Sequence, residues 1–235
     1  MKVVLFCGGL GTRLREYSPT VPKPLVPVGE QPIVWHLMRY YAHFGHDDFV
    51  LCLGHGAELI REYFCEQDLD WRITFVDTGS HSNIGQRLWR VRQHVQNEEA
   101  FLANYADGLS DVPLNTLIDD FRRRKVLATF ASVRSPASFH TVGASDDGFV
   151  SSMGAMNHGD LWINGGYFVL SPKIFNFMNE GEELVEKPFA RLIEQKLLTT
   201  YHHRGFWQSM DTFKDKIVFD RMDAQGNCPW IVWKK

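Results

Sequence analysis

A continuous apolar run that passes directly into glycines opens the chain. Residues 3–7 read V-V-L-F-C, and residues 8–14 read G-G-L-G-T-R-L. An unbroken apolar run of this length is typical of a parallel strand buried on both faces. Glycines after such a strand allow the backbone to approach a ligand and to turn its N–H groups toward an anion. The feature predicts an α/β fold with a ligand-binding loop after its first strand.

A proline-rich segment containing one lysine follows, P-K-P-L-V-P-V-G at residues 22–29. Each proline fixes its own φ and biases the residue before it toward extended backbone, so Lys23 is expected on a stiff segment. Arg13 offers a planar, fixed cation and Lys23 a mobile one, and a polyphosphate requires both kinds. Together with the glycine loop, these residues predict a triphosphate-binding site.

Two better-known glycine motifs do not fit this stretch. A P-loop ends in Gly-Lys-Ser/Thr, which is absent here. The dinucleotide-binding fingerprint would use Gly9 and Gly11, but Leu14 stands where its third glycine belongs. Glu30 lies at about the distance expected of a ribose ligand, yet it follows a Pro/Gly loop and not a strand. A nicotinamide-dependent dehydrogenase is therefore disfavoured.

Apolar periodicity predicts strands that alternate with helices along the first half of the chain. We expect helices over 32–44, 57–64, 88–95 and 114–125, and buried strands over 49–54, 73–79 and 100–105. This alternation predicts a Rossmann-like, doubly wound, mostly parallel sheet that binds ligands at the carboxyl ends of its strands. The basic run at 122–125 suits the C-terminal dipole of a helix.

The second half is richer in short strands split by Gly, Asp and Pro. Strands are expected over 128–133, 141–145, 149–153, 167–170 and 198–202, with helices over 175–178, 189–196 and from residue 213. We find neither an internal repeat nor a low-complexity linker. We therefore expect a single domain over 1–235, with a nucleotide-binding half at 1–125 and a mixed β substrate-binding half at 126–235.

The bulk composition is that of an ordinary globular protein. The 235 residues are 44% hydrophobic and 23% charged, with a formal net charge of -3. This charge argues against nucleic-acid and anionic-membrane partners. No apolar stretch approaches the roughly 20 residues of a membrane span, no signal peptide is recognisable, and the four cysteines have no Cys-x-x-Cys spacing. We expect a cytoplasmic protein.

Two aspartates follow segments that are expected to lie near the loop. Asp107 comes just after the predicted strand 100–105, where its carboxylate can hold a Mg²⁺ ion that bridges to a triphosphate. The alternative is an ordinary Asp-Gly turn. Asp211 would supply a second carboxylate, and its alternative is the N-cap of the helix expected from residue 213. No grouping of His or Cys has the spacing of a zinc site.

At this point a family resemblance is evident. The segments G-G-L-G-T-R-L and P-K-P-L-V-P-V-G resemble the signature of the sugar-1-phosphate nucleotidylyltransferases. Q-P-I-V-W-H at 31–36 and G-F-W-Q-S-M-D-T at 205–212 are similar to the members that use CTP and glucose 1-phosphate. The resemblance runs over nearly the whole chain and implies the fold predicted above, an enzyme of nucleotide-sugar synthesis and a requirement for Mg²⁺.

The resemblance also implies a role for each matching residue. The phosphate of a sugar 1-phosphate attacks the α-phosphorus of the nucleoside triphosphate, so catalysis is positioning and charge neutralisation. Arg13 would steady the β- and γ-phosphates, and Lys23 would bridge the α-phosphate and the incoming phosphate. The matching family residues make Asp107 and Asp211 the ligands of Mg²⁺.

Further segments match the family at the nucleotide and the sugar. The expected nucleotide-binding residues are Gly8, Gly9, Gly11, Thr12, Thr78 and Arg87. The expected sugar-binding residues are Gly143, Asn164 and Gly165. The alternative to nucleotide binding is an ordinary loop residue for Thr78 and an arginine at the start of a helix for Arg87. The alternative to sugar binding for Asn164 is a turn residue. CTP is favoured, with dTTP or UTP as alternatives.

The chain departs from the family at two places. Relatives carry Glu-Lys-Pro shortly before Asn-Gly-Gly, and its lysine binds the sugar phosphate, whereas residues 152–159 here contain neither lysine nor glutamate. His158 is a candidate substitute, and Glu186-Lys187-Pro188 comes too late in the chain to match. The segment between Phe64 and Ile73 is shorter than in relatives, where the longer segment contributes to subunit contacts. The resemblance therefore does not decide whether this chain forms a homo-oligomer.

These departures leave two alternatives. The first is the same chemistry with a non-glucose phosphate or phosphonate as acceptor. The second is a catalytically weak nucleotide-binding regulator. A regulator is expected to have lost Lys23 or one of the two aspartates, and all three are present.

Overall fold

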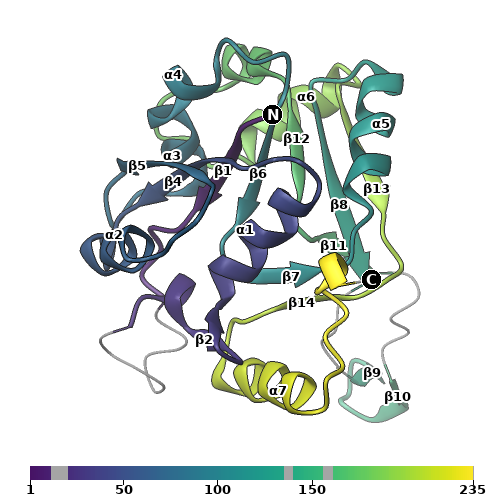
Figure 1. Ribbon diagram of the computed structural model, residues 1–235. Helices are drawn as coiled ribbons and strands as arrows, with labels where there is room; N and C mark the ends of the chain where they lie inside the picture. Colours follow the sequence, from purple (N-terminus) through teal and green to yellow (C-terminus); the bar gives the residue numbers. More distant parts are fainter. Residues whose placement is uncertain (12–20, 135–139, 156–160, 235) are drawn as a thin grey trace.

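The computed structural model describes residues 1–11, 21–134, 140–155 and 161–234. A central sheet runs through the molecule with helices on both faces (Figure 1). Its parallel half is made of β1 (Val3–Phe6), β4 (Asp48–Leu53), β5 (Arg72–Asp77) and β6 (Phe101–Tyr105). β1 lies between β4 and β6, and β5 pairs with β4. The predicted doubly wound, mostly parallel sheet is confirmed.

The second half of the chain extends the same sheet. Its strands are β8 (Ala128–Arg134), β11 (Trp162–Asn164), β12 (Phe168–Leu170) and β13 (Leu198–His202). β12 is antiparallel to β6 and to β8, β11 is antiparallel to β8, and β13 runs parallel to β8. The two halves expected from the sequence therefore contribute to one continuous sheet.

The apolar run at the start of the chain is explained by burial on both faces. Val3 and Leu5 point into one core cluster, and Val4 and Phe6 point into another on the opposite face. The first cluster is covered by α1 (Ile33–His43), α2 (Ala57–Cys65), α5 (Leu114–Arg124) and α7 (Phe213–Ala224). The second is covered by α3 (Ile84–Arg90), α4 (Arg92–Val95), the 3₁₀ helix Pro172–Phe177 and α6 (Lys187–Glu194). Alternation of side chains along a strand requires both faces to be apolar here.

The helix predicted over 88–95 is divided and begins earlier than expected. α3 starts after Asn83, whose side chain accepts a hydrogen bond from the backbone N–H of Gln86, while the backbone N–H of Asn83 donates to the side-chain oxygen of Gln86. Such a capping box fixes a helix start regardless of apolar periodicity. The helix predicted over 175–178 is 3₁₀ and begins at Pro172. No described helix is long and apolar enough to span a membrane.

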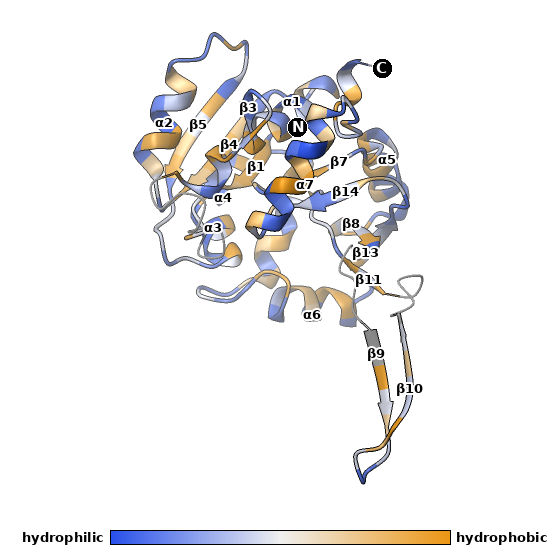
Figure 2. Cartoon of the chain, turned by 90° about the horizontal axis from the view of Figure 1, so that it is seen from below, coloured by the Kyte–Doolittle hydropathy of each residue, from blue (hydrophilic) through white to orange (hydrophobic). Residues whose placement is uncertain are grey.

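Three short strand pairs lie outside the main sheet. They are β2 (Pro27–Val28) with β3 (Gln31–Pro32), β7 (Gly108–Ser110) with β14 (Trp207–Ser209), and β9 (His140–Ala144) with β10 (Val150–Ala155). The β9–β10 hairpin projects away from the body of the protein (Figure 2). The β7–β14 pair was not predicted, because three-residue strands carry too little pattern to be recognised.

Candidate active site

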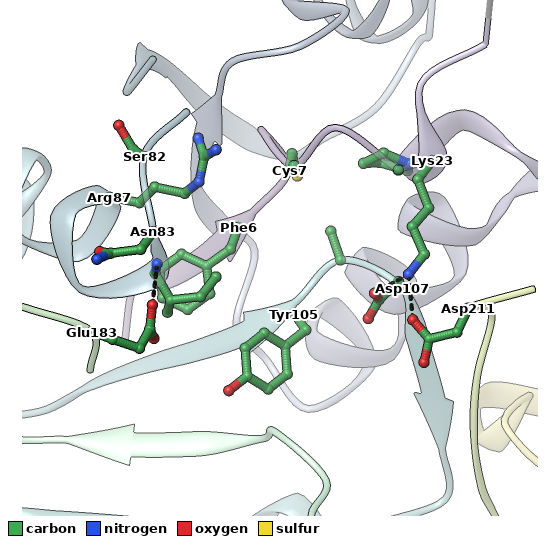
Figure 3. A pocket seen from close by; sticks show the side chains of 15 residues that line it. Phe6, Cys7, Lys23, Ser82, Asn83, Arg87, Tyr105, Asp107, Glu183 and Asp211 are labelled. Carbon is green, nitrogen blue, oxygen red and sulfur yellow. Dashed lines mark hydrogen bonds and ion pairs between the residues drawn. The ribbon is translucent and has the colours of Figure 1, made fainter. Parts of the chain in front are cut away.

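A cavity of about 350 Å³ opens at the carboxyl ends of β1 and β6, the edge at which a doubly wound sheet binds ligands. Its lining comes from segments far apart in the chain: the glycine loop, the 3₁₀ helix Lys23–Leu25, the β6–β7 turn, the start of α3, and residues 183 and 211 (Figure 3). The residues are Phe6, Cys7, Gly9, Gly11, Lys23, Pro24, Ser82, Asn83, Ile84, Arg87, Tyr105, Ala106, Asp107, Glu183 and Asp211.

Three of the predicted residues meet at one end of this cavity. The ammonium of Lys23 lies 2.5 Å from Oδ2 of Asp107 and 2.9 Å from Oδ1 of Asp211 (Figure 3). Burial alone would lower the pKa of Lys23, but the charges of both carboxylates and the hydrogen bonds to them outweigh burial and raise that pKa. The side chains of the two aspartates remain 28% and 31% exposed, so this group is open to a ligand.

The β7–β14 pair explains how two aspartates so distant in sequence come together. Asp107 lies in the turn between β6 and β7. Ser209 of β14 pairs with Gly108 of β7, and the N–H of Met210 donates to the carbonyl of Asp107 at 2.8 Å. This register places Asp211 directly beside Asp107. Asp107 thus occupies the predicted Asp-Gly turn and also faces the cavity.

Asp211 is not the N-cap of α7. That position belongs to Thr212, which forms a capping box with Asp215. The N–H of Asp211 donates to Oδ2 of Asp215 at 3.0 Å, while its own carboxylate accepts from Lys23 and from the hydroxyl of Ser209. The carboxylate of Asp211 is thereby kept for the cavity.

The far end of the β7–β14 pair is closed by Asp111. Its Oδ1 accepts hydrogen bonds from the N–H of Phe206 at 2.7 Å and from the ring of the buried His203, whose Nε2 lies 2.9 Å away. The hydroxyl of Ser110 also donates to the carbonyl of Phe206, at 2.5 Å. Asp111 therefore holds the loop that leads into β14 and toward Asp211.

We expect the Asp111→Ala variant to lose about 1–3 kcal/mol of free energy of unfolding, because the N–H of Phe206 loses its acceptor and the buried His203 loses the shorter of its two contacts. Turnover should fall as well, since β14 positions Asp211. Urea unfolding and a rate assay on the same preparation measure both effects. Asp119→Ala, on the exposed side of α5, is the matched control. Unchanged stability and unchanged rate would contradict the role given to this carboxylate.

The glycine loop lies at the same edge. Gly9 and Gly11 line the cavity, and Gly11 has a φ of 59° with Lys23 close by, so that a Cβ there would lie 3.2 Å from that of Lys23. Gly8 has a different reason to be glycine, because a Cβ would lie 2.0 Å from Nη1 of Arg87. Thr12 and Arg13 lie outside the described residues.

Arg87 and Thr78 lie in the wall behind the loop. Arg87 donates to the carbonyl of Gly8 at 2.8 Å, to the hydroxyl of Thr78 at 2.8 Å and to the carbonyl of Leu53 at 3.3 Å. Its side chain is only 2% exposed, and burial lowers its pKa. Thr78 is completely buried and is not among the residues that line the cavity. In this structure the pair fixes the glycine loop to β4, and Arg87, unlike Thr78, also lines the cavity.

The predicted sugar-binding residues are only partly brought to the cavity. Asn164 donates to the hydroxyl of Tyr105, a cavity residue, at 3.1 Å and accepts from the N–H of Gly166 at 2.9 Å. Gly165 is adjacent, and its carbonyl accepts from the indole of Trp207 at 2.8 Å. Gly143 lies instead on β9 of the projecting hairpin. His158 lies outside the described residues.

Several cavity residues were not singled out by any sequence pattern. Tyr105 was recognised only as the end of a strand, although side-chain alternation along β6 predicts that it shares a face with Phe101 and Ala103. Asn83 could have been identified from the Asn-x-x-Gln spacing of a capping box. Glu183 carries no signal, because it reaches the cavity from the loop before α6.

The donor set at the Lys23 end fits a divalent metal ion of the Mg²⁺ type. Two carboxylates converge on one cationic group. Among the described residues, no group of three or more His, Cys, Asp or Glu side chains is arranged to hold a metal. Mg²⁺ is usually held by one or two carboxylates together with substrate phosphates and water, so two aspartates suffice when a nucleotide is present.

Comparisons with known proteins identify the family and the fold. The sequence model described as nucleotidyl transferase matches residues 2–215. A glucose-1-phosphate cytidylyltransferase of Salmonella typhimurium is 36% identical over 260 aligned positions, covering 100% of both chains. A Bacillus subtilis protein named as a probable glucose-1-phosphate cytidylyltransferase is 34% identical, over 99% of this chain and 100% of its own. The solved UDP-glucose pyrophosphorylase from Acinetobacter baumanii has a TM-score of 0.73 at 16% identity, covering 99% of this chain and 96% of that one.

The Salmonella alignment spans 260 positions, more than the 235 residues of this chain. That relative therefore has residues for which this chain has no counterpart. This agrees with a shortened chain, although the alignment length does not locate the missing residues between Phe64 and Ile73.

Proposed function

Because this chain belongs to the nucleotidyl transferase family and is 36% identical over its full length to a glucose-1-phosphate cytidylyltransferase, we propose that it transfers CMP from CTP to a sugar 1-phosphate. Glucose 1-phosphate is the first acceptor to test, and pyrophosphate is the second product. The observation that carries the proposal is the contact of Lys23 with both Asp107 and Asp211 at one end of the cavity.

The proposed reaction needs no activated protein nucleophile. An oxygen of the sugar phosphate, already anionic, forms a bond to the α-phosphorus of CTP. The bond from that phosphorus to the bridging oxygen breaks, and pyrophosphate leaves with the electron pair. Both substrates are anions, so the protein must bring two negative phosphates together and neutralise the charge that develops.

Lys23 is the residue we propose for this neutralisation. Its ammonium is compact and sits on a flexible stem, whereas its backbone is held by the adjacent prolines and by the hydrogen bond from the N–H of Val26 to the carbonyl of Lys23 at 3.1 Å. The side chain can thus turn from the carboxylates to bound phosphates while its anchor remains fixed. Arg13 is proposed to hold the leaving pyrophosphate.

Asp107 and Asp211 are the residues we propose to hold Mg²⁺. When bound, the ion would neutralise phosphate charge and orient the α-phosphate. The two carboxylates already face a shared cation in this structure, and a nucleotide that draws Lys23 away would let the metal take the place of the ammonium.

Pyrophosphate release tests the proposal. The enzyme is assayed with Mg²⁺, each of CTP, UTP, dTTP, GTP and ATP, and a panel of sugar 1-phosphates that includes glucose. We expect the highest kcat/KM with CTP. Preference for dTTP or UTP would overturn the nucleotide assignment, and activity with CTP only on another phosphate or phosphonate would change the acceptor. If no pair of substrates releases pyrophosphate while CTP still raises the melting temperature, the result would favour a nucleotide-binding regulator.

A further inference from the structure

The cavity has two chemically different ends. Lys23, Asp107 and Asp211 lie at one end, and Ser82, Asn83 and Glu183 lie at the other, with Phe6 and Tyr105 between them (Figure 3). A nucleotide that places its phosphates beside Lys23 and the glycine loop directs its base toward the Glu183 end. The polar groups there are therefore those that a base would meet.

Glu183 is held in the wall by backbone N–H groups. The N–H of Ile84 donates to its Oε2 at 3.1 Å, and the N–H of Leu184 donates to its Oε1 at 3.0 Å. A carboxylate has about four acceptor positions, more than these backbone donors occupy, so it can accept a further hydrogen bond. The half-buried side chain lines the cavity, and a base entering it can supply that donor.

Close packing fixes the loop that carries Glu183 against the start of α3. A Cβ at Gly85 would lie 2.1 Å from the carbonyl oxygen of Glu182. The two backbones can therefore approach this closely only because residue 85 is glycine. The side-chain amide of Asn83 donates to the carbonyl of Gly181 at 3.0 Å. Two independent contacts, at the two residues that precede Glu183, therefore fix the backbone that carries its carboxylate.

The other polar side chains at this end are engaged elsewhere. Asn83 uses its amide oxygen on the N–H of Gln86, the hydroxyl of Ser82 donates to the carbonyl of Thr78, and Arg87 is directed at Gly8 and Thr78. Among the described lining residues, Glu183 is the one carboxylate at this end. An ionised carboxylate only accepts hydrogen bonds.

This property distinguishes the pyrimidine bases. Cytosine has an amino group at position 4, which donates, whereas uracil and thymine have a carbonyl oxygen there, which accepts. We propose that Glu183 selects the base, accepting a hydrogen bond from the 4-amino group of cytosine and repelling the 4-carbonyl of uracil and thymine. The inference rests on the proposed cytidylyl transfer and identifies the residue that gives that site its preference for CTP.

The test compares CTP with UTP in the wild type and in Glu183→Gln. Glutamine keeps the size and one acceptor for the N–H of Ile84 but adds a donor that suits the 4-carbonyl of uracil. We expect the CTP/UTP ratio of kcat/KM to fall by about 10- to 100-fold, the range expected when a hydrogen bond to a charged group is lost. Glu186→Gln removes the same charge from an exposed position in the same loop and should leave the ratio unchanged.

A second measurement removes the hydrogen bond from the ligand instead of the protein. The triphosphate of pyrimidin-2-one riboside lacks the 4-amino group but is otherwise like CTP. Its dissociation constant, measured by calorimetry, should exceed that of CTP by about 10- to 100-fold in the wild type and differ little from it in Glu183→Gln. This comparison remains valid if the variant is less stable than the wild type.

The outcomes separate the two proposals. A wild type that prefers CTP, with a ratio unchanged in Glu183→Gln and equal affinity for both pyrimidine ligands, overturns the role of Glu183 and leaves cytidylyl transfer intact. A wild type that does not prefer CTP overturns both. A ratio that falls equally in Glu186→Gln would assign the effect to the charge of the loop and also overturn the proposal.

Discussion

Replacement of Lys23 by alanine is expected to lower kcat by about 10²–10³-fold, the loss that follows removal of one group that stabilises developing charge in a transition state. The reason is geometric, since the ammonium lies at 2.5 Å and 2.9 Å from the two carboxylates that face the cavity. Initial rates of pyrophosphate release, with both substrates at saturation, measure the effect.

The same variant should unfold at nearly the temperature of the wild type. Lys23 is not part of an apolar cluster, and the two aspartates are exposed enough for water to solvate their charges once the ammonium is lost. Lys214→Ala, on an exposed position of α7, is the matched control and should retain full activity. A Lys23→Ala enzyme that works within about tenfold of the wild-type rate would exclude a direct role for this side chain in a charge-stabilising step.

The elements that the sequence predicts well are those with long, regular burial patterns. β1, β4 and β6 are apolar on both faces because helices cover both sides of the sheet, and α1 and α5 present one apolar stripe each. In these segments local pattern and tertiary environment agree, which makes the pattern readable.

The sequence predicts which residues form the site but not how they come together. Lys23, Asp107 and Asp211 each follow a recognisable segment, yet their meeting depends on the register of β7 with β14. Those strands have three residues each and are about a hundred residues apart, so no local pattern specifies their pairing. The contact of Asp111 with His203 and Phe206 is of the same long-range kind.

Arg87 illustrates a different limit. A helix-start arginine near a nucleotide loop has the same sequence signature whether it binds a ligand or the backbone. Here its guanidinium reaches carbonyl groups of two separate strand ends, Gly8 and Leu53. Only the three-dimensional arrangement of β1 and β4 reveals these backbone contacts, and Glu183 likewise reaches the cavity through a long-range contact, the close approach at Gly85.

The second large effect is expected from the carboxylates. Asp107→Asn and Asp211→Asn should each lower activity at fixed Mg²⁺ by at least about 100-fold, because loss of a group that merely orients a metal ligand already costs 10–100-fold. Part of the loss should be recovered at higher Mg²⁺, so the measurement is the rate as a function of Mg²⁺ concentration. Asp119→Asn is the matched control, and an unchanged Mg²⁺ requirement in both site variants would contradict the assignment.

The structure also predicts that, in the absence of nucleotide, substitution of Lys23 and substitution of Asp107 change the affinity for a metal ion in opposite directions. Lys23 occupies the carboxylates that Mg²⁺ would use, so the ammonium and the metal compete. Lys23→Ala should therefore bind Mn²⁺, used as a paramagnetic probe, more tightly than the wild type, whereas Asp107→Asn should bind it more weakly. Loss of activity by general disruption of the site would weaken metal binding in both variants. Weaker binding of Mn²⁺ in both variants would therefore indicate disruption of the site. It would contradict the exchange of Lys23 for a metal ion, on which the proposed role of the two aspartates depends.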